Sequence, residues 1–231
     1  MKRIALIFSM VALFSLQGVS QRGSNSFGLK IGPSVDWAST ASTASSNEGP
    51  RLGFTMGCII DHYYTQHIAF SSGVNFIQWR GHYQFTDLRH VDDFLEEVPL
   101  SVDRRVQATY FEVPLKFKVK AEVVEGWKAF AEAGVGLSLN WSDKTRDEYD
   151  FYWVSVSDKP FSESYYYEYR WLQAALNFGV GAEYQINRKF GVFAQLSFNH
   201  ALTNTFTKDM EQRTGSNLQT NFIGLEVGIM R

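Results

Sequence analysis

Apolar and polar residues alternate along much of this chain with a period of two. Between Tyr110 and Lys120 every odd position is apolar, whereas most even positions carry a charge. Because successive residues of a β-strand point to opposite faces of its sheet, this pattern predicts a strand with one apolar and one polar face. The alternation recurs, clearly in the first three and less regularly in the others, in segments 127–141, 172–185, 223–229, 27–37, 51–60, 67–80 and 190–203. The sequence therefore predicts eight strands.

The connections between these strands alternate in length. The long ones are 38–50, 81–104, 143–165 and 204–217, and the short ones are 61–66, 121–126 and 186–189. Because consecutive antiparallel strands place every second connection at the same end of a sheet, the long loops are expected to share one end. This segregation is typical of a small outer-membrane barrel. We therefore predict an all-β fold, a transmembrane antiparallel up-and-down β-barrel of eight strands.

Alternation alone leaves the direction of the two faces open, because a soluble ligand-binding barrel of the lipocalin kind has the same period with an apolar interior. The polar face is rich in glycine, which suits the narrow interior of an eight-stranded barrel. Five tryptophans are expected at strand ends, as an interfacial aromatic girdle requires: Trp37, Trp79, Trp127, Trp141 and Trp171. These features favour a barrel with its apolar face toward lipid and its polar face inside.

The first residues have the features of a secretory signal. Two basic residues precede an apolar run that ends at Leu16, and small residues follow from Gly18. We expect residues 1–20 to be a cleaved signal peptide and residues 21–231 to form one barrel domain. No later segment has the roughly 18 consecutive apolar residues that a transmembrane helix needs.

The polar face carries charged residues of both signs. Four of each sign are expected to face the lumen: Lys30, Glu112, Lys116, Lys118, Lys128, Glu132, Glu183 and Glu226. Buried charges are costly unless they are paired, so a balanced set predicts internal salt bridges. Counting back from the turn places Lys116 near Glu132. Closing the last strand on the first brings Glu226 near Lys30.

This set is interpreted as a structural network. The functional alternative is a proton or ion path through the lumen, but side chains fill the interior of an eight-stranded barrel and leave no open channel. Pro114 is unusual within such a wall, because proline removes one hydrogen bond of the ladder. We expect a bulge or local irregularity at Pro114, and a milder one at Pro33.

The segment Tyr110 to Lys118, with the sequence YFEVPLKFK, resembles a signature of the PorT-like outer-membrane barrels of Gram-negative bacteria. In that signature an aromatic residue, an acid, a branched residue and proline open the fourth strand. Segment 27–32 is similar to the first strand of the family, and segments 131–136 and 178–184 look like its fifth and sixth. One departure is the end of the chain, where Met230 and Arg231 stand without the terminal aromatic residue common in such barrels.

The resemblance implies an integral outer-membrane protein. The namesake of the family is an accessory part of the type IX secretion apparatus, so the resemblance also suggests a role in protein secretion. The expected partners are outer-membrane lipid and, through the loops, envelope or secretion-machinery proteins. With a net charge of −2, the chain lacks the broad basic surface that nucleic-acid binding requires.

Catalytic, metal and cofactor signatures are weak throughout the chain. His82 and His90 share a long connection with Asp87, Asp92 and Asp93, but without a recognised ligand spacing, so no metal and no cofactor is expected. Ser197 and His200 suggest a lipid-modifying hydrolase. Their odd spacing places the two side chains on opposite faces of a strand, which argues against catalysis.

Three functions are compatible with the sequence. The first is a non-enzymatic outer-membrane barrel that acts through its loops in envelope organisation or secretion. Segment 143–169 combines charges with seven tyrosine and tryptophan residues, a composition common in binding surfaces, although some of these rings are expected to continue the girdle. The second function is a small-solute pore, and the third is a lipid-modifying hydrolase.

Overall fold

The computed structural model describes residues 25–40, 45–90, 97–151, 154–156, 162–163, 169–187, 189–208, 210–211 and 217–231. The expected signal peptide, residues 1–20, lies outside this part of the chain. Within the described residues, no helix is long and apolar enough to cross a membrane.

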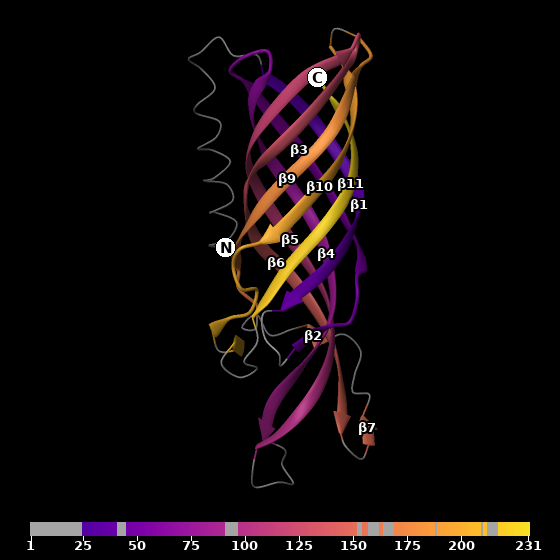
Figure 1. The fold of residues 1–231 in the computed structure, drawn as a ribbon. Coiled ribbons are helices and arrows are strands. Elements are labelled where there is room, and N and C mark those ends of the chain that lie inside the picture. The colour runs from indigo at the N-terminus through magenta and orange to yellow at the C-terminus, as the bar shows by residue number, and fades with distance from the viewer. Residues whose placement is uncertain are drawn as a thin grey trace.

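Eight long strands form a barrel: β1 (Asn25–Thr40), β3 (Arg51–Tyr63), β4 (Ile68–His90), β5 (Glu97–Val124), β6 (Trp127–Phe151), β9 (Leu172–Gln185), β10 (Gly191–Ala201) and β11 (Leu218–Met230). Three short strands pair with the outer parts of β4 and β6, namely β2 (Ser45–Asn47), β7 (Val154–Val156) and β8 (Ser162–Glu163). Figure 1 shows the long strands wound obliquely around one axis, with β2 and β7 at the end opposite the carboxyl terminus.

The sheet closes on itself. Each barrel strand pairs antiparallel with the next, and β1 meets β11 at a seam where Leu29 lies opposite Ile229. On its other edge β1 pairs with β3, where Leu29 lies opposite Cys58. A closed sheet leaves no backbone edge exposed to hydrocarbon, which is the condition for strands to cross a bilayer. The prediction of an eight-stranded antiparallel barrel is confirmed.

The membrane-crossing part of the barrel wall is apolar outside and charged inside. On β5, Phe117 is 64% exposed and Val119 is 53% exposed, whereas Lys118 between them is 2% exposed. The same alternation on β11 exposes Leu225 and buries Glu226. An outer surface of this kind is stable against hydrocarbon, as in outer-membrane barrels.

Three strands are much longer than a membrane crossing requires. About 9–11 residues suffice for a tilted transmembrane strand, but β4, β5 and β6 have 23, 28 and 25 residues. Their pairing continues to His90 opposite Glu97 and to Ser101 opposite Asp150. These paired extensions of β4, β5 and β6, which we call the ribbon, project from the end opposite the carboxyl terminus (Figure 1). The expectation of loops is therefore wrong for residues 81–90, 97–104 and 143–151, which are strand.

The polarity of the two faces inverts where this extension begins. On β5 the inward positions from Glu112 to Lys120 are charged, apart from Pro114, whereas those from Val102 to Tyr110 are mostly apolar. The outward positions change in the opposite sense, from Phe111 and its successors to Gln107, Arg105 and Asp103. Beyond the membrane, water surrounds the ribbon, so the apolar side chains pack inside. The inversion breaks the alternation that marks the strand, which is why the sequence pattern indicates a loop.

A β-bulge marks the same level on β6. Thr109 of β5 lies opposite Ser142, whereas its neighbour Tyr110 lies opposite Asn140, so Trp141 is the extra residue. One inserted residue reverses the direction of every later side chain in a strand. Accordingly Asn140, before the bulge, and Thr145, after it, are both buried, although one has an even and the other an odd residue number.

The two prolines interrupt the ladder without shifting it. Cross-strand pairing lapses for two residues beside Pro114 and again beside Pro33, and the register is the same before and after each gap. Gly73, opposite Pro114, has a φ of 149°, a conformation open to glycine. The expected irregularity at Pro114 is thus present, but it is a gap in pairing and not a bulge.

Four of the five tryptophans expected in the girdle lie on the outer face of the wall, and one does not. Trp79 is only 2% exposed and donates from Nε1 to the carbonyl oxygen of Asn221 at 3.1 Å. It shares the inward face of β4 with Ile77, on the apolar side of the inversion, so the prediction that it belongs to the girdle is wrong. The four outward residues are Trp37, Trp127, Trp141 and Trp171.

Candidate functional site

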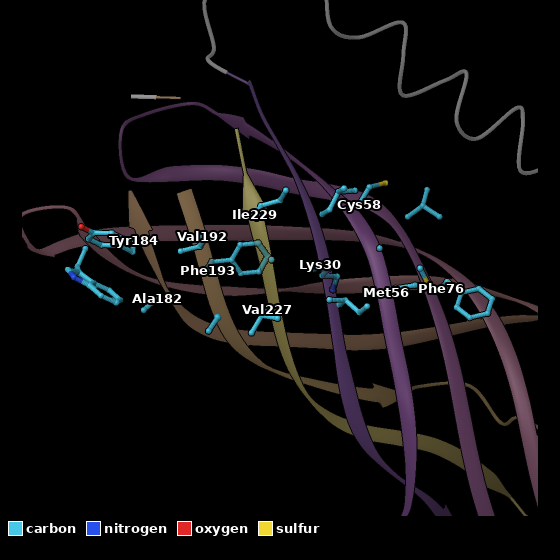
Figure 2. Close-up of a pocket in the computed structure, with 17 residues that line it drawn as sticks. Lys30, Met56, Cys58, Phe76, Ala182, Tyr184, Val192, Phe193, Val227 and Ile229 are labelled. Carbon is cyan, nitrogen blue, oxygen red and sulfur yellow. The ribbon is translucent and has the colours of Figure 1, made fainter. Parts of the chain in front are cut away.

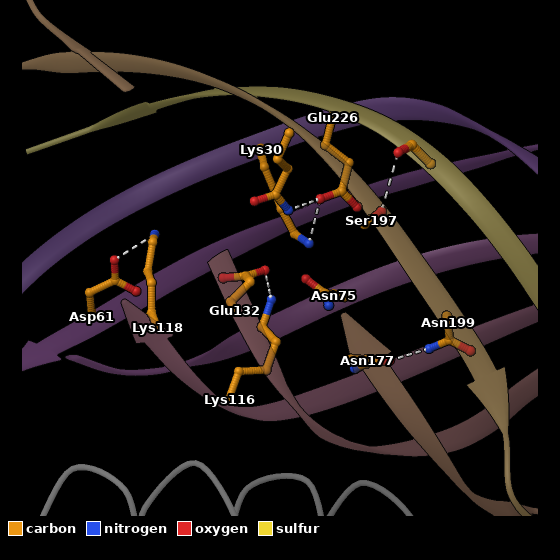
Figure 3. A network of polar contacts seen from close by, with 12 residues as sticks. Lys30, Asp61, Asn75, Lys116, Lys118, Glu132, Asn177, Ser197, Asn199 and Glu226 are labelled. Atoms are coloured by element: carbon orange, nitrogen blue, oxygen red, sulfur yellow. Dashed lines mark hydrogen bonds and ion pairs between the residues drawn. The ribbon is translucent and has the colours of Figure 1, made fainter. Parts of the chain in front are cut away.

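The half of the lumen nearer the short turns holds an ionic layer built from several strands (Figure 3). Lys30 of β1 donates to Glu226 of β11 at 2.9 Å across the closing seam, and Gln195 of β10 donates to the same carboxylate. Lys116 of β5 is ion-paired with Glu132 of β6. Both pairings that the register predicts are therefore present. The Lys30–Glu226 contact joins the first strand to the last.

Two further pairs complete this layer. Lys118 donates to Asp61 at 2.8 Å, and Lys120 is paired with Glu183. The sequence pattern places Asp61 in a turn and leaves Lys120 out of the predicted set. Alternation shows which face a side chain lies on, but it does not show a partner two strands away. Lys118 also lies 4.4 Å from the centre of the Phe130 ring, which adds a cation–π contact.

Lys128 is expected in this network and is not part of it. Its side chain is half-buried at the end of the barrel with the short turns, and its Nζ reaches only Gln185 Oε1, at 3.4 Å. The position lies one residue after the start of β6, beside the turn that joins β5 to β6, where the lumen opens to water. A lysine there needs no carboxylate partner.

Glu112 is held by neutral groups. Its carboxylate accepts from Asn75 at 2.9 Å, from Asn199 at 3.0 Å and from Ser138 at 3.4 Å, and it is buried. Asn199 donates in turn to Asn177 at 2.6 Å. This polar layer lies directly on the short-turn side of the inversion and separates the ion pairs from the apolar residues toward the ribbon.

An aromatic cluster closes the lumen on the ribbon side of that layer. The ring of Phe206, from the segment between β10 and β11, packs edge-on against Tyr83 with 5.9 Å between ring centres, and it also contacts Phe85. The hydroxyl groups of Tyr83 and Tyr169 are hydrogen-bonded at 2.8 Å. The other members of this aromatic cluster are Ala38, Ile77, Trp79, Val102, Val106, Ala108, Tyr110, Met210, Leu218 and Phe222.

Little free space is left between the polar layer and the aromatic cluster. The cavity there, lined by residues that include Tyr110, Ser138 and Asn199, has a volume of about 20 Å³. A single buried water needs about 10–15 Å³ by the same kind of measure. This cavity therefore holds about one water molecule and has no room for a column of water.

The ribbon beyond the membrane carries its own charged contacts. Arg104 makes a bidentate pair with Asp147, at 2.7 and 2.6 Å, and its guanidinium lies 5.1 Å from the centre of the Phe85 ring. His82 links Arg51 at 2.9 Å to Asp103 at 2.7 Å. Such pairs fix the three strands relative to one another, so the ribbon is a stiff projection.

Within the described part of the chain, the residues considered for chemistry are not assembled into a site. The Ser197 hydroxyl donates to the Gly224 carbonyl at 3.5 Å, whereas His200 stacks on the outward ring of Phe198 and bonds to Asn221. Among the described residues, no group of three or more histidine, cysteine or acidic side chains could hold a metal ion. The side chains of His90, Asp87, Asp92 and Asp93 lie outside the described part.

A hollow of about 1080 Å³ lies on the outer wall (Figure 2). Its lining includes Leu29, Ile31, Val227 and Ile229, which are exposed apolar side chains of the lipid-facing surface. Small outward residues such as Ala182 leave the depression between them. Because hydrocarbon covers this wall in the membrane, we interpret the hollow as a contact surface for lipid chains and not as a ligand cavity.

Solved structures with similar architecture are outer-membrane proteins. Neisserial surface protein A is 11% identical, with a TM-score of 0.44, over 90% of this chain and 98% of that one. The N-terminal barrel domain of Pseudomonas aeruginosa OprF is 13% identical, with a TM-score of 0.41, over 91% and 100% of the two chains. P. aeruginosa OprG is 8% identical, with a TM-score of 0.42, over 89% and 96%. These similarities are too weak to carry an argument about function.

No curated protein matches the sequence. A family model does match residues 17–229, and its description is the outer membrane protein beta-barrel domain. The match includes residues of all eight strands of the closed barrel. The chain is an outer-membrane protein and belongs to the outer membrane protein beta-barrel domain family.

Proposed function

We propose that this protein is a non-conducting, non-enzymatic barrel that uses its ribbon to contact other proteins of the cell envelope. Because the short turns of such barrels face the periplasm, the ribbon at the opposite end lies on the cell exterior. The observation that carries the proposal is the continuation of β4, β5 and β6 far past the membrane, with β5 reaching 28 residues. Strands of this length, fixed by the Arg104–Asp147 pair, are more than a barrel needs for insertion. They hold a surface at a defined distance from the bilayer.

The filled lumen supports a binding role over a pore. Ion pairs occupy the half nearer the short turns, and the aromatic cluster with Phe206 and Tyr83 occupies the half nearer the ribbon. Ser197 and His200 lie on opposite faces of β10 and have separate hydrogen-bond partners, which argues against a hydrolase. Mass spectrometry of lipid A from cells with and without the protein tests the hydrolase directly, and we expect identical spectra.

The finer proposal is an accessory role in type IX secretion. It is supported by the resemblance of the segment Tyr110 to Lys118 to the PorT-like signature, in which Glu112 and Pro114 supply the acid and the proline. The test is deletion of the gene, followed by comparison of secreted and surface-attached proteins with those of the parent strain. Loss of exported proteins is expected, and an unchanged exported proteome would rule out the secretion role.

A shortened variant tests whether the ribbon is the contact surface. Phe85 lies directly opposite Val102, so residues 86–101 can be replaced by Asn-Gly, which forms a tight two-residue hairpin. The barrel should still fold, as judged by gel migration with and without boiling. We expect this variant to fail to complement the gene deletion. Full complementation by a correctly folded variant would show that the removed tip is not needed.

A further inference from the structure

The end of the barrel with the short turns, opposite the ribbon, contains a polar hollow. Its volume is about 560 Å³, and it is lined by the turn from Tyr63 to His67 and by the ends of β5, β6, β9 and β10. Short turns of such barrels face the periplasm. We call this hollow the periplasmic vestibule.

The floor of the periplasmic vestibule is fixed and neutral overall. Lys120 is buried and ion-paired with Glu183, and its ammonium lies 5.1 Å from the centre of the Tyr63 ring. The Lys120 carbonyl lies 3.2 Å from Nδ1 of His67. Because Lys120 and Glu183 neutralise each other, the floor adds no net charge to the hollow.

The walls carry an excess of positively charged side chains. Lys128, Lys189 and Arg231 all line the hollow, and none has a side-chain carboxylate within 4.0 Å in the described part of the chain. Among the lining residues, Glu122 is the only acidic side chain besides the paired Glu183. Deeper in the described lumen every buried lysine has a carboxylate partner. The three lining cations that have no such partner therefore lie together at this opening. Cations gathered in a concave site focus a positive potential.

From this arrangement we infer that the periplasmic vestibule binds a carboxylate-rich peptide segment of a periplasmic protein. The hollow has space for a few side chains, and its walls offer amide groups of Gln66 and Gln185 and the rings of Tyr64 and Phe190 beside the cations. That mixture suits a peptide, which presents hydrogen-bonding backbone as well as charge. The site faces the barrel axis, whereas lipid headgroups surround its perimeter. The inference concerns the opposite end from the ribbon and stands independently of the proposed function.

The test is a titration of the full mature barrel in zwitterionic detergent against a fluorescein-labelled peptide of alternating Glu and Gly, followed by anisotropy. We expect binding that weakens as salt is raised. The double variant Lys128→Gln/Lys189→Gln should bind on the order of fivefold more weakly, as expected for the loss of two exposed charge contacts. Lys208→Gln, an exposed lysine near the other end of the barrel, serves as the matched control and should bind like the wild type.

Three outcomes would overturn the inference. One is equal binding by the wild type and the double variant. Another is equal binding of a peptide in which Gln replaces every Glu. The third is an absence of peptide binding by the folded wild type. If phosphatidylglycerol micelles or inorganic phosphate then bind in a variant-sensitive way, the cations belong to a site for a phosphate-bearing ligand. Gel migration with and without boiling confirms that each variant is folded.

Discussion

Replacing Asp61 with asparagine should destabilise the barrel strongly. The side chains of Asp61 and Lys118 are 0% and 2% exposed, and 2.8 Å separates the two charged atoms. At an effective dielectric constant of about 20, two unit charges at that distance attract by about 6 kcal/mol. Part of this attraction offsets the cost of removing Asp61 from water. We therefore expect Asp61→Asn to lower the free energy of unfolding by about 3–5 kcal/mol, as for other buried pairs that lose one partner.

A companion substitution separates the ion pair from its surroundings. Lys118→Met leaves Asp61 with only the Tyr63 hydroxyl, 3.4 Å away, and should cost about 3 kcal/mol. In the variant that combines both substitutions no buried charge remains at the pair, and the introduced methionine would keep the contact with the Phe130 ring. The double variant should therefore lie within about 2 kcal/mol of the wild type.

The assay is equilibrium unfolding in urea from phospholipid vesicles, followed by tryptophan emission. Equal slopes against urea would show that the variants expose the same surface on unfolding. Glu122→Gln, at an exposed position, is the control and should change the free energy by less than about 0.5 kcal/mol. The reasoning is refuted if Asp61→Asn stays within about 1 kcal/mol of the wild type, or if the double variant is as unstable as the two single changes added together.

Three other predictions follow from the wall and the lumen. Gly32→Ala would place a Cβ 2.0 Å from the Leu225 carbonyl oxygen, so the seam between β1 and β11 should fail to close, and the unboiled protein should migrate as unfolded on a gel; Glu122→Gln, at an exposed position, is the control and should migrate as folded. Planar bilayers containing the protein should show no stepwise conductance, because the cavity of about 20 Å³ cannot hold a column of water; discrete channels would contradict the filled lumen. Brominated lipids should quench Trp171, at the outer surface, but not Trp79, so Trp171→Phe should reduce the quenching and Trp79→Phe should not.

The membrane-crossing part of the fold could be predicted from the sequence because one physical rule governs it. Every second residue of the segment from Phe111 to Val119 meets hydrocarbon, and its neighbours fill the lumen, so alternation reports both faces. The same rule places Lys116 near Glu132, since a short turn fixes the register of two adjacent strands. These contacts are local in sequence or follow from closure of the barrel.

The remaining parts depend on information that alternation does not contain. At Tyr110 the solvent outside the wall changes from lipid to water and the pattern inverts, so alternation predicts a loop where β4 and β5 continue. The bulge at Trp141 conceals the continuation of β6 in a similar way. Asp61 escapes prediction because its partner Lys118 comes 57 residues later in the chain, and the expected turn boundary places it outside the wall. An inverted alternation directly after a membrane strand is the signal that could have revealed the ribbon.

The ribbon also determines which part of the protein is accessible on a living cell. From Tyr110 to Ser101 the strand β5 advances by about 30 Å along its own direction, with its neighbours paired beside it. An antibody or a phage approaching the bacterium would therefore meet the far end of the hairpin well before it reached the bilayer, and sequence drift should be fastest there. Surface shaving with a protease should accordingly release fragments from this hairpin first, while the embedded cylinder stays intact.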